Sequence, residues 1–523
     1  MASEFISSAT TGAESACQSG LEFLSRGDFA AAGRAFETAI SLNPSMAQAH
    51  LGLGNSLRRR RQTREAESAL RRAHTLDPAL RDAAYSLAYL MHSTGRDTEL
   101  TAILMELAAR EPADLTLQRQ VAGLLMDFNC FEEAARVARK IAEAAPAAGA
   151  WQRLGVCLLQ SQRLPEAEEA LNSAVLADPL AGFAYLLLSQ TRRATTPDRA
   201  RLGDLQAMLD SGRITGEARA CLHFAMGNWL EDLGDYTAAW AQFSAGNRLR
   251  RDAHPFDRAA WEDYFKRLPK TVKDKDIDRS PSLGQTSQPL CLVGFPGASP
   301  EPLASLLAAH PAVSSLGVSA QMDGLARACQ QLTDKPYPEC LVDIAPPQLD
   351  GLQQGMRDDW PEKTRDSRWV LDETPLNFMH LALILRVFPD SRVIQQHRQS
   401  WDDCLSAYLW SFPHPNHGHV HDLQDLVFFY QQYSALMDHW QESLPTQTLL
   451  KFPANSRMNT PATETQAVWK FLGLNVAPAA ETRHPASRPL LSADPQRRDI
   501  PGRWWNYREH LAPIFGAAGL EPE

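Results

Sequence analysis

The feature that most constrains this chain is a repeat that runs through its first half. Prolines recur at spacings of 34, 34, 34 and 33 residues, at Pro44, Pro78, Pro112, Pro146 and Pro179. A small residue precedes each proline at a fixed offset, at Gly20, Gly54, Ala88, Ala122 and Gly155. Two helices cross closely where a small residue lies at the contact, and proline ends a helix. The spacing therefore predicts stacked helix pairs, that is, an α-solenoid.

Bulky residues complete the pattern, because one follows each small residue in most repeats, as at Phe36, Leu70 and Leu171. In length and register the unit resembles the tetratricopeptide repeat (TPR). A later stretch restores the spacing at Gly227 and Phe243. The resemblance implies a repeat domain over residues 13–265 whose concave face binds an extended peptide or protein partner.

Four consecutive arginines, Arg58 to Arg61, fall where the second repeat turns from one helix to the next. We interpret them as a solvated turn, and a dedicated site for an acidic partner is the alternative.

Charge and composition exclude some partners and locations. The net charge is −10, which argues against a broad nucleic-acid surface. We find no signal peptide, and the apolar stretch MHLALILRVF is too short and too polar to span a membrane. The eight cysteines include no C-x-x-C pair. We therefore expect a cytoplasmic protein with reduced thiols, bound neither to nucleic acid nor to a membrane.

The second half of the chain has a different pattern. Residues 266–289 are polar and punctuated by proline, so we interpret them as a linker. Strand-like runs follow at Leu290 to Phe295, Trp369 to Leu371, Arg392 to Ile394 and Leu449 to Phe452, with helical patterns between them. Strands that alternate with helices predict an α/β domain with a mostly parallel sheet.

Three segments of this half resemble the sulfotransferases. CLVGFPGASPEPLASLLAAHP is similar to the family's first strand, loop and helix. DETPLNFMHLALILRVFPDSRVIQQHRQSWDDCLS is similar to its central motifs, and GRWWNYREHLAPI to its closing segment. The resemblance implies a P-loop-like α/β domain over 290–520, similar to bacterial TPR-sulfotransferases and tyrosylprotein sulfotransferases. Such enzymes move a sulfuryl group from 3′-phosphoadenosine 5′-phosphosulfate (PAPS) to a hydroxyl of a peptide or protein.

The same resemblance implies which residues contact PAPS. Arg398 and Ser406 match the family's arginine and serine for the 3′-phosphate. Pro296, Gly297 and Ser299 match the loop that holds the 5′-phosphosulfate. An arginine at the end of a strand can donate two hydrogen bonds to a phosphate.

Several matched positions have lost the family's chemistry. Gly297 replaces the loop arginine, and Pro300 and Glu301 replace two hydroxyl residues. Proline lacks a backbone donor, and a carboxylate at a helix start competes with a bound anion. Val318 stands where the family has its glutamate base, and Glu373 where it has a lysine.

Other residues are candidates for the missing base. Asp323 and Glu373 are carboxylates near the expected place, and His417 and His419 are imidazoles that titrate near neutrality. His414, His417, His419 and His421 cluster in HPNHGHVH, which we interpret as a loop without metal, a zinc or copper site being the alternative. Ser492 is a weak match for the family's late serine.

Two functions are compatible with these residues. The first is a PAPS-dependent sulfotransferase whose catalysis is impaired, because a cation, a base and a lysine are lost together. The second is a pseudoenzyme that serves as a protein-binding TPR adaptor.

Overall fold

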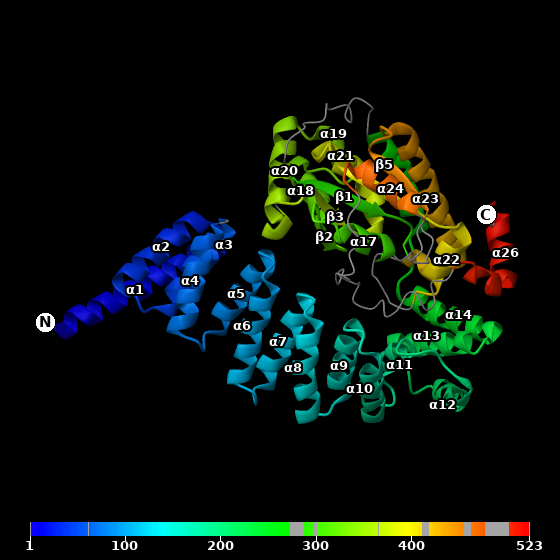
Figure 1. The fold of residues 1–523 in the computed structure, drawn as a ribbon, viewed down its shortest axis with the longest axis horizontal. Coiled ribbons are helices and arrows are strands. Elements are labelled where there is room, and N and C mark those ends of the chain that lie inside the picture. The colour runs from blue at the N-terminus through cyan, green and yellow to red at the C-terminus, as the bar shows by residue number, and fades with distance from the viewer. Residues whose placement is uncertain are drawn as a thin grey trace. The chain divides into compact units, whose positions relative to one another are not determined.

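The structure is a computed structural model, and it describes residues 2–60, 62–271, 287–296, 301–364, 366–410, 418–453, 462–475 and 501–521. The chain divides into two compact units (Figure 1). The first comprises Met1–Ala145 with Pro361–Lys363, and the second comprises Pro146–Trp360 with Thr364–Glu523.

The first unit contains helix pairs, as the repeat predicts. Its helices in the described residues are α1 (Ala2–Ser25), α2 (Phe29–Leu42), α3 (Ala47–Arg59), α4 (Thr63–Leu76), α5 (Arg81–Ser93), α6 (Asp97–Arg110), α7 (Leu115–Asp127) and α8 (Phe131–Ala144). The recurring prolines lie in the short connections that follow α2, α4 and α6, because a proline cannot continue a helix. The TPR-like solenoid expected from the sequence is confirmed.

Close packing explains why a small residue precedes each bulky one. A Cβ added to Gly20 would lie 2.7 Å from the Phe36 ring, and one added to Gly54 would lie 2.6 Å from Leu70. These distances are shorter than carbon atoms tolerate, so at these two pairs a side chain would collide unless the bulky residue shifted, and glycine allows the close approach. The second unit repeats the arrangement at Gly155 with Leu171 and at Gly227 with Phe243.

The second unit begins with further helices and continues into the α/β domain. The first group is α9 (Ala148–Gln160), α10 (Leu164–Ala177), α11 (Gly182–Leu188), η1 (Thr196–Asp198), α12 (Arg199–Asp210), α13 (Gly216–Asp232), α14 (Tyr236–Ala253), α15 (Arg258–Arg267) and η2 (Leu268–Thr271). None of the helices in the described part of the chain combines the length and apolarity needed to cross a bilayer.

A parallel sheet of five strands organises the α/β domain. The strands are β1 (Gln288–Val293), β2 (Val313–Gly317), β3 (Trp369–Asp372), β4 (Arg392–His397) and β5 (Leu449–Pro453), in the order β2-β3-β1-β4-β5. Four of them coincide with the predicted runs. The helices between and after them are α17 (Glu301–Ala308), α18 (Gln321–Thr333), α19 (Cys340–Asp343), α20 (Pro346–Asp359), η3 (Glu362–Thr364), η4 (Pro375–His380), α21 (Leu381–Val387), α22 (Ser400–Tyr408), η5 (Gly418–His421), α23 (Leu423–Ser443), α24 (Ala462–Leu472), η6 (Arg503–Tyr507) and α26 (Arg508–Ala517).

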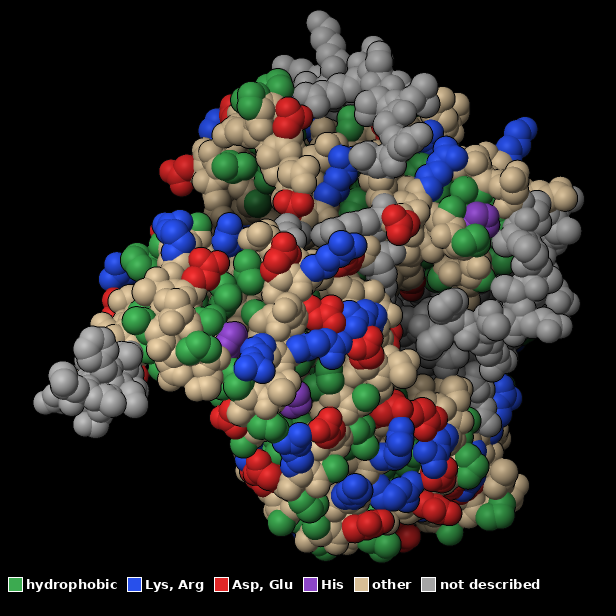
Figure 2. Space-filling view, turned by 60° about the vertical axis from the view of Figure 1, so that its left-hand side comes forward, with side chains coloured by type: hydrophobic (Ala, Val, Ile, Leu, Met, Phe, Trp, Pro, Cys, Tyr) green, Lys and Arg blue, Asp and Glu red, His purple; other side chains and the backbone are tan. Residues whose placement is uncertain are grey.

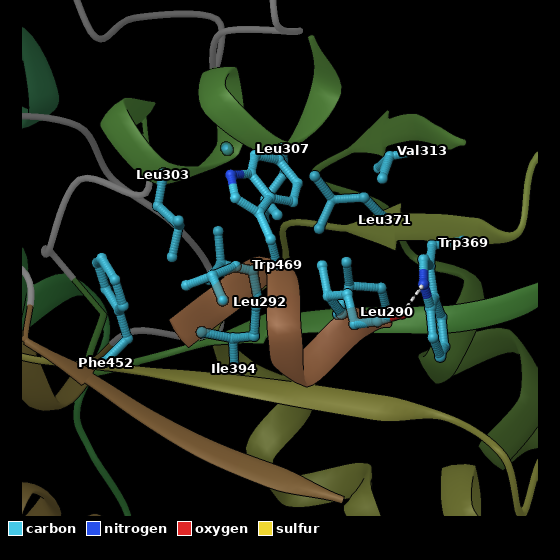
Figure 3. Packing of buried hydrophobic residues seen from close by; sticks show 13 residues of the cluster. Leu290, Leu292, Leu303, Leu307, Val313, Trp369, Leu371, Ile394, Phe452 and Trp469 are labelled. Atoms are coloured by element: carbon cyan, nitrogen blue, oxygen red, sulfur yellow. Dashed lines mark hydrogen bonds between the residues drawn. The ribbon is translucent and has the colours of Figure 1, made fainter. Parts of the chain in front are cut away.

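Helices cover both faces of the sheet. On one face, leucines of α17 and residues of α24 pack against alternate strand residues, as Figure 3 shows for Leu303, Leu307 and Trp469 around Leu290 and Leu292. On the other face, the amide of Gln395 in β4 donates to the Tyr433 hydroxyl of α23 at 3.2 Å. Strand residues point alternately to the two faces, so a sheet covered on both sides needs strands that are apolar throughout. This explains why β1 is buried at every position.

Polar contacts inside the second unit join the last repeat pair to the α/β domain. The side-chain amide of Asn247 in α14 donates to the Tyr408 carbonyl at 2.8 Å. Its oxygen accepts from Nδ1 of His421 at 3.0 Å, which fixes the proton of this imidazole on Nδ1. Trp240 of α14 stacks on Tyr408 with ring centroids 5.1 Å apart. Specific side chains therefore form a joint between the last repeat pair and the α/β domain.

The joint predicts a pH dependence. Burial, with a contribution from nearby Arg250, lowers the pKa of His421 to about 4, so the folded protein keeps this imidazole neutral. An unfolded histidine titrates near pH 6.5, so the unfolded state takes up a proton that the folded state refuses, and stability falls as the pH drops from about 6.5 to about 4. We expect the titration of His421 to lower the free energy of unfolding by about 2 kcal/mol when the pH falls to about 5.

Urea unfolding followed by tryptophan fluorescence tests this expectation. The His421→Asn variant lacks the titrating group, so its unfolding midpoint should change less than the wild-type midpoint between about pH 7.5 and about pH 5. The same pH dependence in both proteins would show that His421 does not contribute.

Candidate functional site

The carboxyl ends of the parallel strands form the candidate site. In the strand order β2-β3-β1-β4-β5, the chain leaves β1 toward one edge of the sheet and forms β2 on the far side of β3. After β3 the chain turns toward the other edge and forms β4 on the far side of β1. Ligands of open α/β sheets bind where the strand order reverses in this way. The residues that follow β1, β2, β3 and β4 here are those that the sequence singled out.

The loop after β1 is described only at its start. Pro296 is buried, and the backbone N–H of Gly294 donates to the Pro375 carbonyl at 3.4 Å, which places this loop against η4. Gly297, Ser299 and Pro300 lie outside the described residues. Glu301 begins α17, so the helix that the sequence predicted after the loop is present.

Asp372 closes β3 and is almost completely buried. Its carboxylate accepts from the Ser319 hydroxyl at 2.7 Å and from the Thr374 backbone N–H at 3.0 Å. Burial raises the pKa of Asp372, although these donors oppose the rise. The hydrogen bonds tie the loop after β2 to the end of β3, so Asp372 has a structural task at the rim of the crevice.

Glu373 fills the position where the resemblance implies a lysine. Its side chain is buried, with 3% of the residue exposed, and Oε1 accepts from the Ser315 hydroxyl at 2.5 Å. Its backbone N–H donates to the Gly317 carbonyl at 2.9 Å. A carboxylate is thus built into the crevice, with a hydroxyl of β2 to hold it.

Val318 is the residue at the position where the resemblance implies a glutamate base. It follows Gly317, whose φ of 69° lies in the left-handed region that favours glycine. The side chain is 49% exposed and carries no group that accepts a proton. The turn at Gly317 is therefore followed by a side chain that cannot accept a proton.

Arg398 follows β4, as the sequence predicted, but a carboxylate of its own chain lies beside it. The side chains of Arg398 and Asp403 are 5% and 3% exposed, and Nε lies 3.6 Å from Oδ1 of Asp403. Ser406 lies farther along α22 and is partly buried. Desolvated opposite charges attract strongly, so Asp403 competes with a phosphate for this guanidinium.

Asp323 belongs to a chain of polar contacts that the sequence did not indicate. One of its oxygens lies 3.1 Å from Nε2 of His380, and Nδ1 of this imidazole lies 3.2 Å from the Tyr337 hydroxyl. The Asp323 side chain is 55% exposed, whereas that of His380 is 11% exposed. No spacing in the sequence links these residues, because they lie on three separate elements.

Of the remaining candidate bases, the structure describes His419, which contributes little accessible chemistry. His419 is fully buried and stacks on Phe429 with ring centroids 3.8 Å apart, so it offers no surface to an acceptor. His414, His417 and Ser492 lie outside the described residues. Within the described ranges, no group of three or more His, Cys, Asp or Glu side chains is placed to hold a metal ion.

The closing segment gives the carboxylate of Asp402 a structural role. Asp402 accepts from the backbone N–H groups of Gly502 at 2.7 Å and Trp504 at 3.4 Å. The indole N–H of Trp504 donates to Gln399, the neighbour of Arg398, at 2.9 Å. Arg503 pairs with Glu231 of α13, where Nε donates to Oε1 at 2.6 Å. The motif thus anchors the end of the chain next to the crevice and to the last repeat pair.

The described residues do not fit the charge of PAPS. Around the carboxyl ends of β3 and β4 they place the buried acidic residues Asp372, Glu373 and Asp403, and Asp403 lies beside Arg398. A donor with several negative charges needs cations and backbone N–H groups at these positions. We therefore derive no reaction step through PAPS.

Comparisons with known proteins agree with both halves of the chain. A model of the sulfotransferase family matches residues 289–478, and a tetratricopeptide repeat model matches residues 17–80 and 124–182. An uncharacterized protein of Aquifex aeolicus (strain VF5) is 23% identical over 411 residues, which cover 75% of this chain and 53% of that protein. The chain thus spans about half the length of this relative.

Solved structures with similarity to the chain are TPR proteins. YrrB, described as a TPR protein with an unusual peptide-binding site, shares 18% identity over 40% of this chain and 97% of its own, with a TM-score of 0.24. A tetratricopeptide repeat protein from Parabacteroides merdae shares 14% identity over 48% of this chain and 97% of its own, with a TM-score of 0.27. The fold and the matched residues together identify a protein that joins tetratricopeptide repeats to a domain of the sulfotransferase family.

Proposed function

We propose that this protein is a TPR adaptor whose sulfotransferase-family domain is impaired in PAPS-dependent sulfuryl transfer. The repeats would hold a peptide or protein partner, and the α/β domain would serve as a structural or binding module. The limits that we propose for the two domains are residues 13–265 and 290–520, with 266–289 between them. Arg398 and Ser406 remain the residues that we propose for any residual binding of a 3′-phosphate.

The observation that carries the proposal is the buried carboxylate of Glu373. A charge reversal at a buried position acts over a short distance in a medium of low polarity, where electrostatic effects are large. The Ser315 hydroxyl that donates to Glu373 stabilises the carboxylate at the place where a lysine would stabilise the leaving phosphate. Val318 removes the proton acceptor as well, and each such loss costs orders of magnitude in rate.

A cytoplasmic location is part of the proposal. All eight cysteines carry free thiols, and seven of them are buried. Burial raises the pKa of several of these thiols, such as Cys130, Cys157 and Cys221, each to about 12, which leaves them unreactive. Unpaired cysteines are typical of proteins kept in a reducing compartment.

A transfer assay tests the proposed function. We expect the purified full chain, given labelled PAPS and tyrosine-containing peptides, to transfer no sulfate above a control without enzyme. Restoring one residue should not rescue transfer, because the loop, base and lysine act on one transition state and their losses are not additive. The informative gain-of-function variant combines Gly297→Arg, Pro300→Thr, Glu301→Thr, Val318→Glu and Glu373→Lys.

Robust transfer by the unmodified protein would overturn the proposal. Asp323 would then be the first candidate base, since its carboxylate is exposed and supported by His380. Asp323→Asn would abolish such transfer if this carboxylate takes the proton, while Asp359→Asn, an exposed aspartate at the end of α20, serves as the matched control.

A further inference from the structure

Asp323 and His380 form an ion pair whose charge depends on a proton. Most ion pairs among the described residues join a carboxylate to an arginine, as Arg71 does with Glu67, and arginine stays charged at every physiological pH. Figure 2 shows such charges as blue and red side chains interspersed over the visible face. Histidine differs because its ring is charged only while both nitrogens carry a proton. The contact between Nε2 of His380 and Asp323, at 3.1 Å, is therefore one that pH can change.

The hydrogen bonds around His380 require two protons on its ring. The Tyr337 hydroxyl donates to the Met379 carbonyl at 3.2 Å, so its oxygen is left to accept from Nδ1 of His380, also at 3.2 Å. On the other side of the ring, Nε2 faces the Asp323 carboxylate, and an ionised carboxylate accepts but does not donate. Both ring nitrogens must therefore donate, which an imidazolium does and a neutral imidazole cannot.

The neighbouring phenols keep their protons over the range in which histidines titrate. Burial raises the pKa of Tyr337, and it also raises the pKa of Tyr264, whose hydroxyl donates to the same Met379 carbonyl at 3.5 Å. The imidazole is thus the group of this cluster that gains or loses a proton near neutrality. The titratable and charged groups that face the ring or lie behind the two phenols are Asp323 of α18, Tyr264 of α15, Tyr337, Cys329, Cys340 and the ion pair of Arg267 with Glu339.

A neutral His380 has one proton too few for the three contacts, so one contact must open. Met379 is buried, and a buried carbonyl that loses a donor is costly to the folded protein. The Asp323 side chain is 55% exposed, so water can replace the imidazole at this carboxylate with little loss. The contact that opens at higher pH is therefore the one that joins α18 to η4.

We propose that Asp323 and His380 form a pH-dependent latch that holds the start of α18 against η4 at the rim of the crevice. The preceding residue Ser319 donates to Asp372 at the end of β3, so the latch lies beside the candidate site. The latch is closed while His380 carries both protons and open once one of them is lost, so the rim is held more firmly at lower pH. This device needs neither PAPS nor a partner, and it is independent of the proposed function.

Hydrogen exchange of the full chain, measured by mass spectrometry at about pH 6 and about pH 8.5, tests the latch, since these values lie on either side of the ordinary titration of histidine. Protection is calculated relative to unstructured peptides at each pH, so the direct effect of pH on exchange cancels. In the wild type, we expect the protection of residues 321–327 to fall by about twofold to fivefold at the higher pH, as the loss of a partly exposed ion pair would give. Peptides from α23 serve as the internal reference.

Two variants should remove the pH dependence without removing the contact. Tyr337→Phe lacks the oxygen that accepts from Nδ1, so a neutral His380 can keep its one proton on Nε2 for Asp323. Asp323→Asn carries an amide, which can accept from a protonated Nε2 or donate to an unprotonated one. Both variants should protect the start of α18 about equally at the two pH values. Asp350→Asn is the matched control, since Asp350 is an exposed residue of α20, and it should show the wild-type fall in protection.

Two results would overturn the latch. The first is a wild-type protection of residues 321–327 that stays the same at both pH values relative to α23. The second is a fall in protection in either Tyr337→Phe or Asp323→Asn that equals the fall in the wild type. That result would show that the second proton of His380 does not decide whether α18 is held against η4.

Discussion

Gly182→Ala is expected to destabilise the second unit by about 3 kcal/mol or more, because the added methyl group would collide with backbone atoms. A Cβ at this position would lie 1.9 Å from the Ala218 carbonyl oxygen and 2.6 Å from its carbonyl carbon. A side chain in the way could rotate, but a backbone carbonyl can give way only if α11 and α13 move apart. Gly182 begins α11 and is buried against α13, so their separation would expose apolar surface.

The measurement is the thermal and urea unfolding of the second unit, followed by near-ultraviolet circular dichroism in the full chain. Gly203→Ala is the matched control, since Gly203 lies inside α12 and a Cβ there would meet nothing within 4 Å. Alanine is the better helix former by about 1 kcal/mol, so this control should raise stability slightly. If both substitutions raise the melting temperature, the close approach of α11 and α13 at Gly182 is wrong.

The repeat architecture was predictable because its signal is redundant. Each pair needs a small residue against a bulky one, and the pattern recurs often enough that single departures do not obscure it. The third repeat carries Ala88 where other repeats carry glycine, and Ala88 and Leu104 are nevertheless fully buried in a regular helix pair. The exposed residues of the array carry no such redundancy, which is why Arg58 could be interpreted only as a turn residue or a partner site.

The sheet was predictable where its strands are apolar. Of the five strands, β2 was missed, because VSSLG is short and three of its five residues are only partly buried. Its place at the edge of the sheet explains this composition, since an edge strand is covered less completely. The helical pattern after β3 is less regular than the sequence suggests, because its start belongs to the 3-10 helix η4 and regular α-helix begins only at Leu381.

The candidate site was predictable only where a motif fixes position along the chain. Arg398 follows the end of β4, as its motif implied, and the structure adds that Val318 and Glu373 follow β2 and β3. Their partners come from the tertiary fold, so the contact of Arg398 with Asp403 and that of Glu373 with Ser315 left no trace in spacing. His419 was considered a base from its residue type alone, whereas its stacking on Phe429 depends on the position of α23.

The ion pair of Arg503 and Glu231 carries the second large effect, because it fastens the end of the chain to α13. The two side chains are 11% and 10% exposed, so both charges are largely withdrawn from water. Removing one partner of a buried pair leaves an uncompensated charge and typically costs about 3–5 kcal/mol. Arg503→Ala should therefore loosen η6 and α26 as well as lower the stability of the second unit.

Hydrogen exchange measured by mass spectrometry separates these two consequences. In Arg503→Ala, backbone amides of residues 501–521 should exchange much faster than in the wild type, and so should those around Asp402, which accepts from Gly502 and Trp504. Arg508→Ala is the matched control, because Arg508 lies on the same segment outside the ion pair. Its guanidinium lies over the Trp505 ring at 4.6 Å and donates to the Trp505 carbonyl at 3.2 Å.

The double variant Arg503→Met with Glu231→Leu should recover part of the protection, since two apolar side chains leave no buried charge. Unchanged exchange in Arg503→Ala would mean that the buried Tyr507 ring, packed against Tyr236 and Trp240, holds the segment without the ion pair.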